Sequence, residues 1–365
     1  MNILHIDEQM TWRGGEQQAS WLMQGLAKLG HRVWLAARPG SAILDSDHGG
    51  AAIRQVPAAL RGEFDLASAM TLSRLVRSAP IDVLHAHTSH AHTIACLARK
   101  FAARGKVAVS RRVSFEPKPH ALNRWKYSWP DKFLSVSGRV DEVLQDFGIP
   151  ESRRAVVYSS VDLARLDVDP IPRAQIGIPD DAPLLLSAGA LVGHKDHATL
   201  LEAMPAVLAE FPSARLFIAG EGDLRTSVEE RIAGLGLDGS IRLLGHRDDV
   251  PALIRAADVY VSSSWSEGLG TSVLEALACR IPVVATIAGG VPEMVRDGVT
   301  GRLVANRDPD ALSTAIRATL RDRAGAAIMA NAGRKLVEDR FTVDGMVEGT
   351  LRVYESLLNN SRTGG

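Results

Sequence analysis

The sequence predicts an α/β protein of two open domains, each built on a parallel β-sheet. Short apolar runs rich in β-branched residues alternate with stretches of helical periodicity, which is typical of βαβ units. A proline-rich break at 167–183, with Pro170, Pro172, Pro179 and Pro183, separates two such series and predicts a linker. At about 150 residues per domain, a chain of 365 residues has room for two domains.

Each half of the chain contains a series of expected strands. In the first half they are Asn2–Ile6, Val33–Ala37, Ile81–His85, Val107–Val109, Phe133–Val136 and Ala155–Tyr158. In the second half they are Leu184–Ser187, Arg215–Ala219, Ile241–Leu244, Val259–Ser262, Pro282–Ala285 and Arg302–Val304. Helices are expected at Gln17–Leu29, Leu66–Arg77 and Thr93–Ala103, and from about Asp308 to Leu358. Continuous apolar runs such as 184–186 are typical of strands covered on both faces.

The composition is that of an ordinary soluble globular protein, with 46% apolar and 23% charged residues. Its two cysteines, Cys96 and Cys279, exclude a disulfide framework and a cysteine-based zinc site. No apolar run approaches the ~18 residues of a membrane span. Asp7 and Glu8 come too early for a signal peptide, so a cytoplasmic location is expected.

Positive charge is concentrated in the first half, although the whole chain is neutral. Residues 1–165 contain 22 Lys and Arg against 15 Asp and Glu, and the remainder contains 20 against 27. Ten basic and two acidic residues lie between Arg99 and Lys132, with Trp125, Tyr127 and Trp129 among them. This mixture is typical of a membrane interface or a site for an anionic substrate. A solvated helix with packing aromatics fits the same pattern, whereas no nucleic-acid motif accompanies the charge.

A glycine-rich turn that opens a helix is the sharpest binding signal in the sequence. The turn follows the expected strand at 258–262, and Gly268 and Gly270 let the backbone turn tightly and approach a ligand. Thr271 and Ser272 are expected to cap the helix, whose free N–H groups and dipole attract an anion such as a diphosphate.

Two carboxylates flank this turn. Glu267 precedes it, and Glu275 lies in the helix that follows. Carboxylates repel phosphates but accept hydrogen bonds from hydroxyl groups, so the pair suits the sugar and the ribose of a sugar nucleotide. The plainer alternative is a helix start whose acids are favoured by the helix dipole.

This segment resembles the paired-glutamate signature of retaining GT-B glycosyltransferases of family 4. Other segments match that family in order and spacing: Gly189–His197 with Lys195, Gly220–Leu224, Leu244–His246, Ala288–Glu293 and, near the start of the chain, Arg13–Gln17. The resemblance covers nearly the whole chain and is closer in the second half than in the first.

The resemblance implies the GT-B fold, in which two Rossmann-like, doubly wound domains face a cleft. The acceptor domain would span 1–167 and the nucleotide-sugar domain 168–343, and a helix within 344–365 would pack back on the first domain. The implied reaction moves a hexose-like sugar from a nucleotide diphosphate sugar with retention of anomeric configuration, without a cofactor or a metal. The acceptor would be a saccharide or an anionic glycolipid in cell-envelope or lipopolysaccharide synthesis, reached by peripheral contact with the inner face of the plasma membrane.

The resemblance also implies roles for single residues. Glu267 would contact hydroxyls of the donor sugar, Glu275 would hold the ribose, and Lys195 would neutralise the diphosphate. Lys195 also has a physical argument, since a point charge at a strand-to-helix junction reaches a phosphate. The other implied donor contacts are Gly14, Gly15, Gly189, Gly222, Gly268, Leu269, Gly270, Thr271 and Ser272.

Three segments depart from the family pattern. Tyr158-Ser159-Ser160 stands where the family often has Pro-Asn-Gly. Ala190 stands where an arginine commonly follows the glycine, so one phosphate partner is missing or is supplied by a residue such as Arg247. Ser110-Arg111-Arg112 stands where many members carry a histidine, so no histidine role transfers there. The candidate donor or acceptor contacts that remain are His87, Arg111, Arg112 and Arg247.

A run of histidines supports a different enzyme class. His85, His87, His90 and His92 follow an expected strand, where alternate side chains point to one side as metal ligands must. This pattern fits a metal-dependent hydrolase, and it also fits histidines that line a cleft without a metal. A non-catalytic sugar-nucleotide-binding protein is the third hypothesis, supported by Ala190. A dehydrogenase is not expected, because no Gly-x-Gly-x-x-Gly motif opens the first helix.

Overall fold

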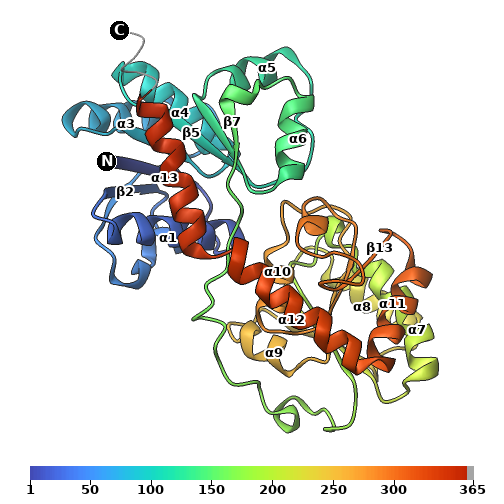
Figure 1. The fold of residues 1–365 in the computed structure, drawn as a ribbon. Coiled ribbons are helices and arrows are strands. Elements are labelled where there is room, and N and C mark those ends of the chain that lie inside the picture. Colours follow the sequence, from blue (N-terminus) through green and yellow to red (C-terminus); the bar gives the residue numbers. More distant parts are fainter. Residues whose placement is uncertain (360–365) are drawn as a thin grey trace. The chain divides into compact units, whose positions relative to one another are not determined.

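The computed structural model of the protein describes residues 1–359 and divides into two compact units (Figure 1). Unit 1 contains Met1–Ser160 together with the segment that begins at Val343, and unit 2 contains Val161–Thr342. Each unit is a doubly wound α/β structure on one parallel sheet, as the sequence predicts. Within residues 1–359, no helix is long and apolar enough to cross a membrane.

Unit 1 is built on a seven-stranded sheet with the strand order β3-β2-β1-β4-β5-β6-β7, and all pairings are parallel. The strands are β1 (Asn2–Asp7), β2 (Arg32–Ala37), β3 (Ile53–Pro57), β4 (Val83–Ala86), β5 (Lys106–Arg111), β6 (Lys132–Ser135) and β7 (Arg154–Val156). β1 pairs with β2 on one side and with β4 on the other, so the strand order of the sheet reverses between β1 and β4. The carboxyl ends of β1 and β4 mark the place where such sheets bind ligands.

Helices cover both faces of this sheet. They are α1 (Gly14–Lys28), α2 (Ala42–Asp45), α3 (Leu66–Ser78), α4 (Ser89–Ala102), α5 (Ala121–Ser128), α6 (Gly138–Asp146) and α13 (Val343–Asn359). Figure 1 shows α13 alongside α1, and a Cβ on Gly25 of α1 would lie 2.4 Å from a methyl group of Val347. Tyr354 of α13 is fully buried in the same core as Ile3 and Leu22, so α13 is an integral part of unit 1.

Unit 2 is built on a six-stranded parallel sheet with the order β10-β9-β8-β11-β12-β13. The strands are β8 (Leu184–Ala188), β9 (Arg215–Ala219), β10 (Ile241–Gly245), β11 (Val259–Ser262), β12 (Val283–Thr286) and β13 (Arg302–Val304). The helices are α7 (His197–Glu210), α8 (Arg225–Gly234), α9 (Val250–Ala256), α10 (Thr271–Ala278), α11 (Pro309–Arg321) and α12 (Arg323–Arg340). Its core is aliphatic and contains Leu185, Leu216 and Ile316, none of which is exposed.

The expected linker at 167–183 is instead anchored to unit 2. The backbone N–H of Ile171 donates to the carbonyl of Ala252, and the Arg173 guanidinium pairs with Asp258 at 2.8 Å. Ile176 and Ile178 are buried in the same segment. The prolines prevent a long helix there but do not prevent packing against the sheet.

Two helix starts also differ from the expectation. α1 begins at Gly14, so the glycine pair forms the first turn of the helix instead of a loop before it. α4 begins at Ser89 because the Thr88 side chain caps it by accepting a hydrogen bond from the N–H of Ala91.

Candidate active site

The candidate site in unit 2 lies where the strand order of the sheet reverses. β8 is flanked by β9 on one side and by β11 on the other, with Tyr260 of β11 in register with Leu186. The loops that follow β8 and β11 therefore begin side by side at the carboxyl edge of the sheet. This is the general position of ligand sites in open α/β sheets.

Hydrogen bonds join these two loops directly. The backbone N–H of Trp265 donates to the carbonyl of His194 at 3.0 Å, and its indole Nε1 donates to the carbonyl of Gly193 at 3.0 Å. The Ser263 hydroxyl donates to the carbonyl of Lys195, also at 3.0 Å. These contacts fix the backbone that carries Lys195 relative to the loop that carries Glu267.

Lys195 and Glu267 form an ion pair between the two loops. Lys195 Nζ lies 2.6 Å from Glu267 Oε1, and the Ser264 hydroxyl donates to the same oxygen at 2.7 Å. The two side chains are 19% and 11% exposed, so both charges are partly withdrawn from water. A Cβ on Gly189 would lie 3.2 Å from Lys195 Cε, so the glycine leaves the space in which the lysine side chain lies. An anionic ligand at this place would compete with Glu267 for the ammonium group.

Glycines allow the backbones around this pair to approach closely. Gly289 has a φ of +52°, and a Cβ there would lie 1.7 Å from the carbonyl oxygen of Glu267. In the same way, a Cβ on Gly220 would lie 1.9 Å from the carbonyl oxygen of Gly189, and one on Gly222 would lie 2.4 Å from that of Leu191. Both candidate loops are therefore supported by glycine turns that follow the neighbouring strands.

The start of α10 differs in detail from the expectation. Gly270, with a φ of +97°, occupies the N-cap position, and no side chain caps the helix. Thr271 and Ser272 are the first two helical residues, so the prediction that they cap the helix is wrong. The helix begins directly after the glycine, so both hydroxyls lie past the cap position. The N–H groups of this first turn remain directed out of the helix, while Leu269 is buried beneath the turn.

Glu275 lies in the second turn of α10 and pairs with a residue that the sequence did not single out. Arg165 Nη1 lies 3.1 Å from Glu275 Oε1, whose side chain is 17% exposed. Burial raises the pKa of Glu275, and Arg165 opposes that shift. Burial likewise raises the pKa of the Tyr260 hydroxyl, and the negative charges of Glu275 and Glu267 raise it further. The charges of both carboxylates thus act on one buried hydroxyl, that of Tyr260.

Most of the remaining candidates lie together in unit 1. A pocket of about 390 Å³ is lined by Arg13, Gly15, Glu16, His87, Arg111 and Arg112, at the carboxyl ends of β4 and β5 and beside the start of α1. We call it the strand-edge pocket. Arg112 Nη2 donates to His87 Nδ1 at 3.2 Å, and a Cβ on Gly15 would lie 3.5 Å from Arg112 Cδ. Arg111 donates to the Tyr127 hydroxyl at 2.7 Å. Gly14 precedes Gly15 as the first residue of α1.

Arg247 lies apart from the Lys195–Glu267 pair within unit 2. It follows β10, an edge strand that is separated from β8 by β9. Its Nε and Nη2 donate to the two carboxylate oxygens of Asp249 at 2.7 and 2.5 Å. In this arrangement the guanidinium is already paired with a carboxylate.

The histidines do not gather as one set. His85 and His87 lie with His5, and their candidate ligand atoms are within 4.8 Å of one another. Arg112 can only donate, so His87 Nδ1 accepts and the proton of His87 sits on Nε2, which then donates to His5 Nδ1 at 2.8 Å. His85 bonds the Tyr354 hydroxyl at 2.5 Å and Ser110 at 2.8 Å. These contacts occupy the lone pairs that a metal would need, next to the fixed positive charge of Arg112.

His90 and His92 belong to the first turn of α4. His90 lies 3.7 Å from Glu8 and its side chain is half exposed, whereas His92 is buried edge-on against Tyr127 and Phe133. Helical geometry directs these two side chains to different sides of α4. The sequence predicts instead that they follow a strand and point to one side. A metal site made of His85, His87, His90 and His92 is therefore not formed in residues 1–359.

Acidification is expected to destabilise unit 1. Burial lowers the pKa of His5 and of His92 to about 3 and lowers the pKa values of His85 and His87 well below their usual range. Between about pH 6.5 and pH 3 the unfolded chain binds protons at these histidines and the folded chain does not, so stability falls as the pH falls. His5 and His92 each contribute roughly 2 kcal/mol between pH 7 and pH 5. Burial raises the pKa of Asp7 to about 7, so protonation of Asp7 stabilises the folded chain as the pH falls. This contribution to the free energy of unfolding offsets that of about one histidine.

Melting temperatures measured between pH 7.5 and pH 5 test this expectation. The substitution His92→Phe keeps the aromatic packing and removes one titrating group, so the melting temperature should fall less steeply with pH than in the unsubstituted protein. A pH dependence that the substitution leaves unchanged would contradict the assignment to buried neutral histidines.

Comparisons with known proteins agree with this geometry. Residues 169–336 match the family described as Glycosyl transferases group 1, and residues 12–165 match Glycosyltransferase Family 4. The lipopolysaccharide core biosynthesis glycosyltransferase LpsE of Rhizobium meliloti is 31% identical over 186 residues, which are 51% of this chain and 54% of that protein. A D-inositol 3-phosphate glycosyltransferase of Geodermatophilus obscurus is 34% identical over 235 residues, which are 60% of this chain and 51% of that protein. The chain thus spans about half the length of these curated relatives.

A solved structure shows the same fold. Anabaena Alr3699/HepE, crystallised in complex with UDP and glucose, superimposes with a TM-score of 0.86 at 20% identity and covers 98% of this chain and 100% of its own. The two family matches together extend over both units, and each unit has the doubly wound sheet that the fold requires. The chain belongs to the GT-B glycosyltransferases of family 4.

Proposed function

We propose that the protein transfers a hexose-like sugar from a nucleotide diphosphate sugar to a saccharide or an anionic glycolipid, with retention of anomeric configuration. The observation that carries this proposal is the Lys195–Glu267 pair, which lies at the strand-order reversal beside the glycine turn that opens α10. A cation, the N–H groups of Thr271 and Ser272 and a carboxylate at one sheet edge suit a ligand that has both phosphates and hydroxyls.

Departure of the diphosphate is the step that this site assists. When the bond between the sugar C1 and the phosphate oxygen breaks, negative charge develops on the leaving phosphate. Lys195 and the N–H groups of the first turn of α10 stabilise that charge as it grows, which costs little reorganisation because both are already held in place. The proposal needs no resident cofactor, since the chain itself supplies the positive charge.

The two carboxylates hold the hydroxylated ends of the donor. Glu267 uses one oxygen for Lys195 and Ser264, and its second oxygen accepts from a hydroxyl of the donor sugar. Glu275 accepts from the ribose, and Arg165 opposes the rise in its pKa that burial causes. Removing either carboxylate is therefore expected to weaken donor binding.

Stabilisation by nucleotides tests donor binding. In a panel of nucleoside diphosphates and their sugars, the compounds with one base should raise the melting temperature. A ligand bound only by the native state adds about 2.7 kcal/mol to the free energy of unfolding at 100 times its Kd. The best donor is then incubated with saccharide acceptors, and NMR of the product reports its anomeric configuration. An inverted product contradicts retention, and stabilisation without turnover on any acceptor favours a non-catalytic binding protein.

The acceptor proposal rests on the composition of unit 1 and on the relatives. Of the ten basic residues at 99–132, those most exposed are Lys100, Arg104, Lys118 and Arg124. Others bond internally, as Lys126 does with Glu63 and Lys106 with Asp131. One relative is named for lipopolysaccharide core biosynthesis, and another is named a D-inositol 3-phosphate glycosyltransferase. Both names support an anionic acceptor of the cell envelope at the inner face of the plasma membrane.

Charge reversal tests this surface. Lys100→Glu combined with Arg124→Glu should reduce turnover on an anionic glycolipid in vesicles severalfold and should remove most of its salt dependence. Turnover on a soluble saccharide acceptor should stay unchanged. If the reversal leaves vesicle activity and its salt dependence intact, the surface plays no part in acceptor binding.

A further inference from the structure

A second cavity of unit 1 is lined by residues of α4, of α5 and of the segment that precedes α3. It has a volume of about 210 Å³, and its lining includes Glu63, Phe64, Asn123, Trp125, Lys126 and Trp129. We name it the α5 cavity. We propose that it binds one neutral sugar ring of the acceptor glycan, next to the unit that reacts. The volume is below the roughly 300–1,000 Å³ typical of drug-sized ligands, so it suits a single ring and not a nucleotide.

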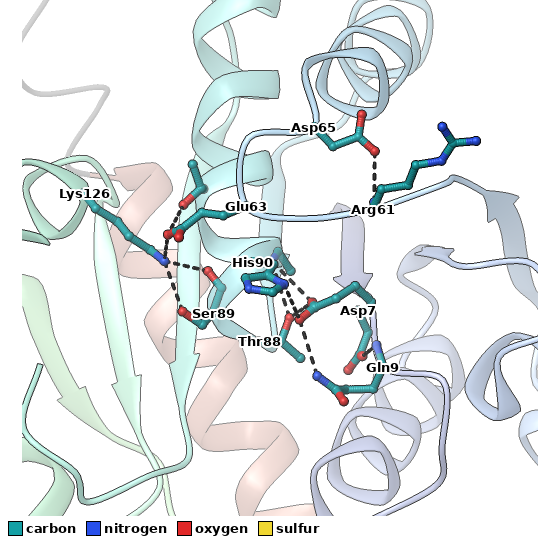
Figure 2. Close-up of polar contacts among 12 residues, drawn as sticks. Asp7, Gln9, Arg61, Glu63, Asp65, Thr88, Ser89, His90 and Lys126 are labelled. Atoms are coloured by element: carbon teal, nitrogen blue, oxygen red, sulfur yellow. Dashed lines mark hydrogen bonds and ion pairs between the residues drawn. The ribbon is translucent and has the colours of Figure 1, made fainter. Parts of the chain in front are cut away.

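The charges of the α5 cavity cancel. Figure 2 shows Lys126 directed at Glu63 and Ser89: its ammonium forms a close ion pair with Glu63 and donates to the Ser89 carbonyl at 2.8 Å and hydroxyl at 3.1 Å. The Lys126 side chain is only 8% exposed. Glu63 and Lys126 are the lining residues with fixed charge, so the cavity offers no uncompensated cation for a phosphate or a carboxylate. Its chemistry favours an uncharged guest.

Aromatic rings form the outer wall. The Trp125 side chain is 47% exposed, and its ring centroid lies 4.1 Å from that of Trp129 at an interplanar angle of 65°. Phe64 and Leu122 extend this wall and are more than half exposed. One face of a pyranose ring presents C–H groups, which pack well on an aromatic surface.

Polar atoms of the cavity remain available for hydroxyl groups. Glu63 Oε1 accepts from Lys126 and from Thr93, which leaves Oε2 without a contact among residues 1–359. Asn123 donates its amide N–H to the Lys118 carbonyl, and Oδ1 has no partner within the same residues. His120 Nδ1 accepts from the backbone N–H of Asn123, so a neutral His120 carries its proton on Nε2. An acyl chain would leave these groups unsatisfied, whereas a hydroxylated ring satisfies them.

The position of the α5 cavity links it to the strand-edge pocket. α4 contributes His92 to the strand-edge pocket and Thr93 to the α5 cavity, and α5 contributes Tyr127 to the first and Trp125 to the second. The two spaces therefore share the wall formed by these helices. A role in acceptor selection rests on the proposed glycosyltransferase activity, and it predicts an acceptor of at least two sugar units. Binding of a sugar ring as such does not depend on that activity.

Saturation-transfer NMR on the full chain tests the proposal. The probes are methyl glucoside, methyl mannoside, methyl galactoside and N-acetylglucosamine, each alone and without a nucleotide. We expect transfer to at least one of them, reduced at least tenfold by Trp125→Ala and by Glu63→Gln. Trp125 is exposed, so its removal should leave the melting temperature nearly unchanged. Phe101→Ala, which removes an exposed aromatic side chain of α4 outside the lining of the α5 cavity, should bind like the unsubstituted protein.

The same measurement on Lys195→Ala separates this proposal from the proposed function. Sugar binding should persist there even if no donor is turned over. Transfer to none of the four sugars, or transfer that Trp125→Ala leaves intact, overturns the proposal. The proposal is also overturned if the protein binds no sugar but sediments with phosphatidylglycerol vesicles, and Trp125→Ala abolishes that sedimentation. The aromatic wall would then be a membrane contact.

Discussion

Replacing Lys195 by alanine is expected to lower turnover on the order of 100-fold, with a smaller effect on the apparent affinity for the donor. In the proposed mechanism the ammonium acts mainly on charge that develops as the diphosphate leaves, and loss of one such group typically costs 10²–10³ in rate. Steady-state kinetics with the donor identified by thermal shift measures the effect. Lys335→Ala removes a lysine that is 76% exposed on α12 and serves as the matched control.

A double variant distinguishes chemistry from structure at this position. Lys195→Ala alone leaves the partly buried Glu267 carboxylate without its cation, which lowers stability. Adding Glu267→Gln removes that charge, so the melting temperature should recover, while turnover should stay well below that of Glu267→Gln alone, which already lacks the proposed contact to the donor sugar. Turnover equal to that of Glu267→Gln alone would mean that Lys195 serves only to neutralise Glu267.

Replacing Gly289 by alanine is expected to cause the second large loss, with turnover falling at least tenfold and the melting temperature falling by several degrees. The new Cβ would lie 1.7 Å from the carbonyl oxygen of Glu267, so the backbone of the loop that carries Glu267 must move. Displacements of about 1 Å from productive geometry can cost on the order of 100-fold in rate. Turnover and thermal unfolding of the same preparation measure both effects.

Gly298→Ala is the matched control for this substitution. Gly298 has a φ of +69°, similar to that of Gly289, but a Cβ there meets nothing within 4 Å. It therefore reports the conformational cost of a left-handed alanine, about 1–2 kcal/mol, without the collision. If the two variants lose equal activity, the close approach of Gly289 to Glu267 is not what positions the carboxylate.

The positions of most strands along the chain were predictable because their apolar runs are distinct. β8 and β12 are buried on both faces, so their sequences are continuous apolar runs. β3 was missed because it is an edge strand whose residues Arg54 and Gln55 are exposed, which leaves little of the apolar pattern. The start of α4 at Ser89 was missed because it depends on one capping residue, Thr88. The histidine-containing segment around Thr88 also fits the end of a strand.

The candidate site was predictable in its parts but not in its contacts. The sequence singled out Lys195 and Glu267, which lie 72 positions apart, and the sheet order brings them within 2.6 Å. No local sequence signal shows that Gly289 packs against the backbone of Glu267 or that Arg165 pairs with Glu275. Their contacts are tertiary, and only their places in unit 2 reveal what they do.

The return of α13 to unit 1 has a consequence for biosynthesis. Tyr354 and Val347 complete the core of unit 1, yet about 180 residues of unit 2 are translated before them, which takes on the order of 10–40 seconds at 5–20 residues per second. During that interval the nascent first unit presents an uncovered apolar face around Leu22 and Ile3 to the surrounding solution. The polypeptide should therefore recruit a holdase chaperone during elongation, and a ribosome stalled before codon 343 should carry an immature, protease-sensitive first unit.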